Sequence, residues 1–213
     1  MTQFEKTFNL MKNPWSIAIY IVLIILAYHF IDIPLASYFH QLDIRTNLHM
    51  LNLLTFLGKD ILYVALFLLA GLYFRYIRTN SVNEARSWYL LACIIIANLI
   101  CLIIKVILGR ARPDLLFSIN AFGLYWFKFS GQYWSLPSGH TTTVISLAAG
   151  LGVVFPRFFY VFLVLAFFIV LTRVVLYYHY LSDVMTAFYL SILVIGLLTQ
   201  YLKRNNYLSK VWK

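Results

Sequence analysis

The sequence has little charge, few acidic side chains and very little cysteine. Charged residues make up 11% of its 213 positions and hydrophobic residues 62%, whereas a typical soluble domain has about 25% charged residues. Long unbroken apolar runs replace the strict alternation of a membrane barrel strand, which excludes that class. The composition therefore predicts an all-α polytopic membrane protein with a single membrane-embedded domain over residues 1–213.

Two features that could suggest secretion are missing from the chain. The only cysteines, Cys93 and Cys101, lie in one apolar run, about 12 Å apart along a helix, which is too far for a disulfide. The first apolar run lacks the short core and small-residue cleavage site of a signal peptide. We expect the cysteines to be packing thiols and the first run to remain as a membrane span.

Six apolar blocks approach the length of about 20 residues that a helix needs to cross a bilayer. They are Trp15–Ile31, Ile61–Ile77, Trp88–Leu108, Thr141–Phe155, Phe158–Tyr177 and Leu181–Leu202. The sequence thus predicts a six-transmembrane-helix bundle. An even number of spans places both termini on one side of the membrane.

Basic residues are unevenly divided between the two sides of this topology. A net charge of +10 would suggest nucleic acid in a soluble protein, but here the cations lie mostly between apolar blocks, so no nucleic-acid partner is expected. The side with the termini carries Lys6, Lys12, Arg75, Arg78, Arg86, Arg157, Lys203, Arg204, Lys210 and Lys213. The other side carries Arg45, Lys59, Lys105, Arg110, Arg112, Lys128 and Arg173. The positive-inside rule therefore predicts cytoplasmic termini.

The connection 109–136, on the side away from the termini, is rich in aromatic residues. Its rings include Phe117, Phe122, Tyr125, Trp126, Phe127, Phe129, Tyr133 and Trp134. Such rings favour the headgroup zone of a bilayer. They indicate either simple interfacial anchoring or a rim that guides a lipid headgroup to a site.

A first polar cluster follows the third block. Lys105 and Arg112 lie seven residues apart, so they share a face if the helix continues until Pro113 helps to end it. Arg110 is expected to point elsewhere. The cations indicate either an anion site or side chains that reach back to the headgroups from a helix end.

A second cluster, Pro137-Ser138-Gly139-His140, precedes the fourth block. Proline and glycine suit a helix start that approaches a ligand closely, and backbone N–H groups at a helix start favour an anion. His140 can give or take a proton. The alternative is an N-cap with an incidental histidine.

A third cluster joins the last two blocks and contains Thr172, Arg173, His179 and Asp183. The i, i+4 spacing of His179 and Asp183 brings their side chains together if this segment is helical. A carboxylate on one ring nitrogen fixes the tautomer and raises the basicity of the other nitrogen. The pair indicates either a nucleophilic histidine or a buried polar tie between helices.

The predicted topology brings all three clusters to the membrane face opposite the termini. Together they supply three cations, backbone donors, a hydroxyl, two imidazoles and one carboxylate. This set suits a phosphate or pyrophosphate. It predicts neither a metal nor a cofactor, because Asp183 is the only hard oxygen ligand and no cysteine is near the two histidines.

At these residues the chain resembles the type-2 phosphatidic acid phosphatase family of membrane lipid phosphatases. The family pattern reads Lys-x6-Arg-Pro, Pro-Ser-Gly-His and Ser-Arg-x5-His-x3-Asp. The matching segments run from Lys105 to Pro113, from Pro137 to His140 and from Thr172 to Asp183, with Thr172 in place of serine. Threonine keeps the hydroxyl, and all three segments occur in order at the family spacing.

The resemblance implies a metal-independent phosphatase that works through a phosphohistidine. It assigns His179 as the nucleophile, Asp183 as its orienting partner, and His140 as the proton donor to the leaving oxygen and the later activator of water. The phosphate-binding groups are Lys105, Arg112, Ser138, Gly139 and Arg173. The family also includes soluble vanadate-dependent haloperoxidases, an activity that six spans argue against.

The resemblance leaves the substrate open. The short chain is similar to bacterial members, for which we expect undecaprenyl pyrophosphate, phosphatidylglycerol phosphate or phosphatidate, with the phosphates of lipid A as the alternative. A lipid or anion transporter ranks lower, since no discontinuous helices in matched halves are evident. We expect a bacterial inner-membrane protein whose site faces the periplasm, with the bilayer and a phosphorylated lipid as partners and no obligate protein partner.

Overall fold

Helices form almost all of the regular structure, as the apolar blocks predict. The computed structural model describes residues 1–47 and 49–212, and within these ranges no β-strand occurs beyond one isolated bridge between Arg110 and Leu124. The elements are α1 (Gln3–Met11), α2 (Pro14–Leu26), the π-helix η1 (Ala27–Ile31), α3 (Asp32–Gln41), α4 (Ile44–Asn47), α5 (His49–Phe56), α6 (Asp60–Tyr76), α7 (Ser81–Leu108), α8 (Pro113–Ile119), η2 (Gly131–Tyr133), α9 (Gly139–Val154), η3 (Pro156–Phe158), α10 (Phe159–Val175), α11 (Leu181–Arg204) and η4 (Ser209–Trp212).

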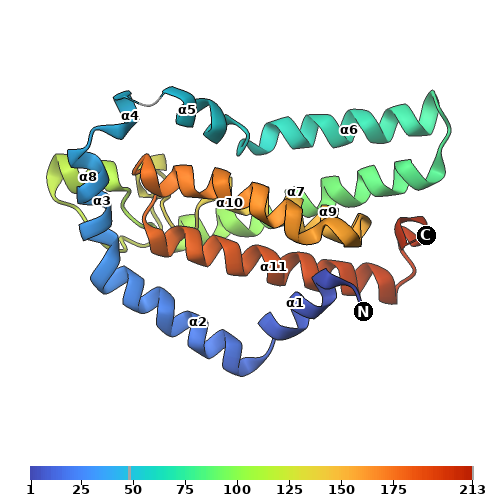
Figure 1. The fold of residues 1–213 in the computed structure, drawn as a ribbon, viewed down its shortest axis with the longest axis horizontal. Coiled ribbons are helices and arrows are strands. Elements are labelled where there is room, and N and C mark those ends of the chain that lie inside the picture. The colour runs from blue at the N-terminus through green and yellow to red at the C-terminus, as the bar shows by residue number, and fades with distance from the viewer. Residues whose placement is uncertain (48, 213) are drawn as a thin grey trace.

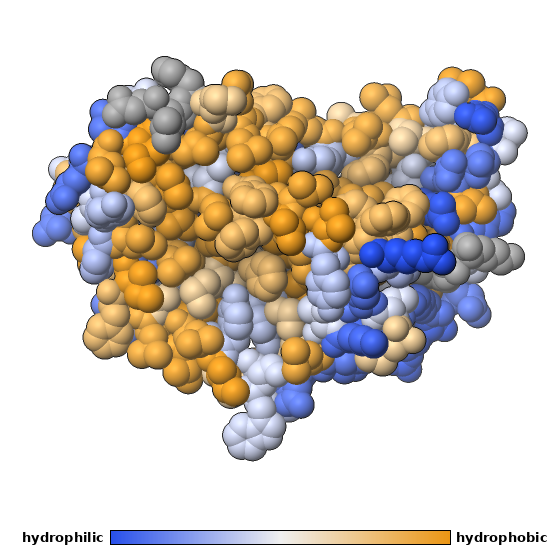
Figure 2. All heavy atoms as spheres, in the orientation of Figure 1, coloured by the Kyte–Doolittle hydropathy of each residue, from blue (hydrophilic) through white to orange (hydrophobic). Residues whose placement is uncertain are grey.

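Several of these helices are long and apolar enough to cross a membrane. Helix length and composition give four such spans in the described ranges, or five if the bent pair α5–α6 counts as one. Apolar side chains cover most of the face seen in Figure 2, and hydrophilic ones gather mainly at the end that carries the termini. The chain is thus an all-α integral membrane protein. The sixth predicted span is not obtained from helix length alone.

The first predicted span continues well beyond its expected end. The chain was expected to leave the membrane at Asp32, but α2, η1 and α3 form one helical run over Pro14–Gln41. Asp32 is only 1% exposed and ion-pairs with Arg110. A buried and neutralised carboxylate does not need to end a helix in water, so the polarity of Asp32 alone gave the wrong boundary. The segment after the first predicted block is correspondingly helical in α3, α4 and α5.

Helix α9 is short and lies among the other helices. It has 16 residues, most of them buried, and it packs against α7, α10 and α11. Small residues allow helix backbones to approach closely. At Gly150, for example, an added Cβ would lie 3.0 Å from Leu90 Cδ2. Gly139–Val154 therefore forms the centre of the bundle and positions the cluster at its first turn.

The two ends of the bundle differ in what they carry. Both termini lie at one end, whereas α8, α3 and the turn between α10 and α11 lie at the other (Figure 1). At the first end, Lys203 Nζ lies 2.9 Å from Glu5 Oε1, and Phe4 makes an edge-on contact with Phe159. The opposite end holds the three polar clusters described next.

Candidate active site

The first cluster is brought together by a turn and not by one continuous helix. Helix α7 ends at Leu108, and Gly109 adopts the left-handed conformation with φ of 56°. Arg112 then serves as the N-cap of α8, and its backbone N–H donates to the carbonyl of Gln132. Lys105 and Arg112 would share a helix face only if the helix continued to Pro113, and it does not. Glycine ends the helix before Pro113 does, since it tolerates the left-handed cap at no steric cost.

Lys105 is nevertheless held at the site. Its ammonium donates to the Trp134 carbonyl at 2.7 Å, and a Cβ on Gly139 would lie 3.8 Å from Lys105 Cε. The side chain is thus fixed between the end of α7 and the first turn of α9. The first and second clusters meet here, as the predicted topology requires.

The second cluster begins α9. Ser138 is the N-cap residue, and its hydroxyl accepts from the Thr141 N–H and the Thr141 hydroxyl. The Ser138 N–H itself donates to the carbonyl of Asp183 at 3.2 Å. This amide is therefore engaged within the protein, while Gly139 N–H belongs to the first amides of the helix, which lack intrahelical acceptors. The capping interpretation of this motif is confirmed, and Asp183 ties it to the third cluster.

The third cluster spans the turn between α10 and α11. His179 lies in the turn, 2% exposed, and its backbone N–H donates to the Arg173 carbonyl. Asp183 lies in the first turn of α11, which Tyr180 caps, so His179 and Asp183 are not on one helix. Their side chains still approach, with 3.6 Å between Nδ1 and Oδ2. This separation is slightly longer than a hydrogen bond.

The charges around His179 are predominantly positive. Burial lowers the pKa of His179 well below its ordinary value; Asp183 opposes this shift, and the charges of Arg112, Lys105 and Arg173 add to it. The imidazole is therefore neutral at pH 7, with a free lone pair. All five residues lie close enough to interact electrostatically, which is the cationic, anion-attracting arrangement that the motifs predict.

Arg173 and His140 come from different sides of this cluster. Arg173 is buried at the end of α10 and donates to the Thr55 hydroxyl of α5 at 2.6 Å. His140 lies in the first turn of α9, with its ring against Gly58: a Cβ there would be 2.6 Å from His140 Cδ2. The α5–α6 break therefore closes the site on one side.

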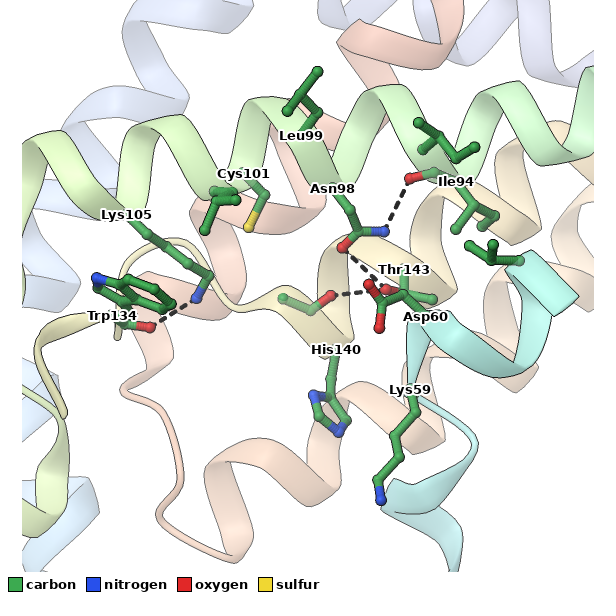
Figure 3. A pocket seen from close by; sticks show the side chains of 15 residues that line it. Lys59, Asp60, Ile94, Asn98, Leu99, Cys101, Lys105, Trp134, His140 and Thr143 are labelled. Atoms are coloured by element: carbon green, nitrogen blue, oxygen red, sulfur yellow. Dashed lines mark hydrogen bonds between the residues drawn. The ribbon is translucent and has the colours of Figure 1, made fainter. Parts of the chain in front are cut away.

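A cavity of about 480 Å³ opens beside this part of the site. Figure 3 shows Lys105 and Trp134 together at one part of its wall, Ile94, Asn98 and Thr143 at another, and His140 beside Lys59. Its lining is polar near Lys105 and His140 and largely apolar along α7. A cavity with both kinds of wall suits an amphipathic ligand.

Three side chains that sequence reasoning did not select form the buried base of the site. Arg110 contacts Asp183 and Asp32, and the Ser135 hydroxyl donates to Asp183. Arg110 is directed at Asp183, the expected orienting partner of His179. The available signal was weak: a second arginine in Gly-Arg-Ala-Arg, and an aspartate next to an apolar run. Their pairing across 78 residues could not be read from either one.

The structure is an all-helical membrane protein in which three cations act electrostatically on the buried imidazole of His179. The PAP2 superfamily profile matches residues 86–207, more than half of the chain and all three clusters. The protein therefore belongs to the PAP2 superfamily. This confirms the family resemblance that the three motifs carry.

Two curated relatives carry a more specific name. The lipid A 1-phosphatases of Rhizobium etli and Rhizobium johnstonii are each 36% identical to this chain over 101 residues. The match covers 46% of this chain but only 44% and 41% of the relatives. The chain thus matches less than half the length of either relative. No solved structure matches the chain.

Proposed function

We propose that this protein hydrolyses a phosphate group on a membrane lipid, through a phosphohistidine on His179 and without a metal ion. The observation that carries the proposal is the neutral, buried imidazole of His179 beside Asp183 and within the field of Lys105, Arg112 and Arg173. Fixed cations that stabilise the transferring phosphoryl group are the main requirement of phosphoryl transfer.

The first half-reaction forms the phosphoenzyme. Nδ1 of His179 faces Asp183, which leaves Nε2 to attack phosphorus. The new N–P bond forms as the P–O bond to the lipid breaks, and His140 delivers a proton to the departing oxygen. Lys105, Arg112 and Arg173 hold the non-bridging oxygens, and the start of α9 at Ser138 and Gly139 adds backbone donors.

The second half-reaction restores the enzyme. His140, now unprotonated, takes a proton from a water molecule as that water attacks phosphorus. The N–P bond breaks, inorganic phosphate is formed, and the electron pair returns to the His179 nitrogen. His140 holds this proton while phosphate is bound, because the anion opposes the burial and the nearby cations that lower the pKa of His140 to about 3.

For the substrate, the relatives favour lipid A over the other candidates. Lipid A ranked as the alternative in sequence reasoning, since the motifs recognise phosphate and not the lipid. The relatives named lipid A 1-phosphatase are 36% identical to this chain over 101 residues, so we propose the 1-phosphate of lipid A as the first substrate to test. The amphipathic cavity beside Lys105 and His140 is compatible with a lipid whose phosphate enters the cation cluster.

The substrate proposal is tested with purified protein in mixed micelles. Phosphate release is measured separately on lipid A, undecaprenyl pyrophosphate, phosphatidylglycerol phosphate and phosphatidate, each with and without a chelator. We expect lipid A to give the highest kcat/KM, with loss of the 1-phosphate and no effect of the chelator. A preference for one of the other three lipids would overturn the assignment of lipid A as substrate. The proposed lipid phosphatase activity would still stand.

The nucleophile is tested by His179→Ala, with His29→Ala as the matched control. His29 is exposed on η1, outside the three clusters. We expect His179→Ala to lower kcat by roughly 10⁴-fold or more and to abolish an acid-labile phosphoenzyme, while His29→Ala keeps both. Full activity of His179→Ala would exclude His179 as the nucleophile.

A further inference from the structure

Arg110 is completely buried at the base of the site and contacts two carboxylates. Its Nη1 lies 2.5 Å from Asp183 Oδ1, and its Nη2 lies 2.6 Å from Asp32 Oδ2. Nη1 also donates to the Ser182 hydroxyl at 2.6 Å. All three charged side chains are at most 1% exposed. Arg110 is therefore engaged inside the protein and does not belong to the cations that hold phosphate.

Aromatic rings seal this guanidinium from water. The Arg110 Cζ lies 4.5 Å from the ring centre of Tyr180, 4.7 Å from that of Tyr28 and 5.4 Å from that of Phe122. Stacking of this kind favours arginine over lysine. Phe122 thus encloses Arg110, and at least this ring of the aromatic connection does not serve as a lid.

Every oxygen of Asp183 is fixed by this arrangement. Oδ1 accepts from Arg110, while Oδ2 accepts from the Ser135 hydroxyl at 2.5 Å and the Tyr180 N–H at 3.0 Å. Oδ2 is also the oxygen that faces Nδ1 of His179. The carboxylate can hold only one orientation, and that orientation is directed at the nucleophile.

Asp32 fixes Arg110 from the opposite side. Its Oδ1 accepts from the Ser182 N–H at 3.0 Å, and its Oδ2 accepts from the Ser182 hydroxyl at 2.5 Å. The junction of η1 and α3 is thereby attached to the start of α11. Two carboxylates share one guanidinium, so the buried group has a net charge of −1.

We propose that Arg110 and Asp32 are positioning residues for the reaction, acting on His179 through Asp183. This inference rests on the proposed function. Arg110 orients Asp183, and Asp32 takes up part of the arginine's charge, so that Asp183 remains an effective anion. The net charge of −1 opposes the positive charge that the imidazole ring gains when Nε2 forms its bond to phosphorus.

The proposal predicts opposite effects of the two charges on the titration of His179. The charged groups that face His179 are Asp183, Lys105, Arg112 and Arg173. Removing Arg110 leaves excess negative charge beside this set, which stabilises the imidazolium. Removing the charge of Asp32 does the reverse. The acidic limb of the kcat/KM profile reports the free enzyme's essential base. It should therefore move to higher pH when Arg110 is removed and to lower pH when the charge of Asp32 is removed.

The experiment compares Arg110→Gln, Asp32→Asn and wild type from about pH 4 to pH 9 on the best lipid substrate. We expect the acidic limb to rise by about one pH unit in Arg110→Gln and to fall by a smaller amount in Asp32→Asn. Inhibition by inorganic phosphate should change less than about threefold in both variants, because neither removes a phosphate-holding side chain. kcat should fall in both.

Two further variants distinguish the effect of the arginine's geometry from the effect of its charge, and both from a general loss of stability. Arg110→Lys keeps the charge without the two-pronged geometry, so its acidic limb should stay near the wild-type value while kcat falls. Thr199→Val removes a buried hydroxyl from the far part of α11, where it contacts Tyr89, and should leave the limb and kcat unchanged.

The isosteric variant Asp32→Asn decides the outcome even if Arg110→Gln does not fold. A downward shift of its acidic limb supports the proposal. An unchanged limb with only a lower melting temperature would mean that the buried group is purely structural, and would overturn it. Failure of the proposed function would give a different result. In that case the wild type would release no phosphate, or His179→Ala would remain active.

Discussion

Gly58 lies against the ring of His140, at the break between α5 and α6. A methyl group at this position would lie 2.6 Å from His140 Cδ2 and 2.9 Å from its Cβ. Atoms do not approach so closely, and Cβ is too near the backbone to move alone. Either His140 or the α5–α6 break must therefore shift when Gly58 is replaced.

We predict that Gly58→Ala lowers kcat by roughly 10- to 100-fold, because a proton donor displaced by a fraction of an ångström loses its alignment. Phosphate release at saturating lipid measures this. Gly131→Ala is the matched control, since a Cβ there meets no atom within 4 Å, and its kcat should equal that of wild type. Equal rates for Gly58→Ala and Gly131→Ala would show that His140 does not need this contact.

The role of a residue could be predicted from the sequence where it depends on near neighbours in the chain. It could not be predicted where it depends on a partner far away in the chain. Ser138 caps α9 as its motif predicts, because a cap depends on residues within one turn. Arg110 was expected only to point elsewhere than Arg112, and its partner Asp32, 78 residues earlier in the chain, was not predicted. Nothing near Arg110 in the sequence distinguishes an arginine that binds phosphate from one that binds a buried carboxylate.

At the scale of elements, the turn between α10 and α11 is held by a side chain from α4. Arg45 donates from Nε to the Leu176 carbonyl and from Nη2 to the Tyr177 carbonyl. Its guanidinium lies 3.9 Å and 4.1 Å from the ring centres of Tyr177 and Tyr178. This turn carries His179, so α4 restrains the proposed nucleophile from outside the three motifs.

We predict that Arg45→Lys lowers kcat by about tenfold and leaves KM nearly unchanged. Lysine keeps the charge but cannot reach both carbonyls while stacked on the rings. Steady-state kinetics on the same lipid measure the effect. Arg157→Lys, an exposed position in η3 at the other end of the bundle, should behave as wild type. A raised KM with unchanged kcat would instead place Arg45 in lipid binding.

The elements themselves were predicted better than their ends. All six apolar blocks correspond to helices, because apolar runs of this length have few other options in a membrane. The third block was predicted to end at Leu108, and α7 ends at that residue, where Gly109 takes the left-handed conformation. The end of the first span was wrong by ten residues, from Ile31 to Gln41, since a buried ion pair lets Asp32 stay in a helix.

At the scale of the whole molecule, most basic residues outside the site lie at the end with the termini, and the candidate site lies at the opposite end. Of the seven cations predicted away from the termini, Lys105, Arg112 and Arg173 belong to the site, and Arg110 is buried in ion pairs. Only Arg45, Lys59 and Lys128 remain on that side, against ten on the side of the termini. The asymmetry is therefore larger than sequence reasoning gave, and it strengthens the proposal that the termini are cytoplasmic.

This orientation makes a direct prediction for impermeant thiol reagents in intact cells. Ser130 lies in the exposed aromatic connection at the site end, and Thr79 lies in the exposed turn between α6 and α7 at the other. The native thiols Cys93 and Cys101 are buried and give a low background. We predict that Ser130→Cys is labelled from outside and that Thr79→Cys is labelled only after the inner membrane is permeabilised. The two variants control each other, because the reverse pattern would place the site in the cytoplasm, where the substrate phosphate would then have to lie.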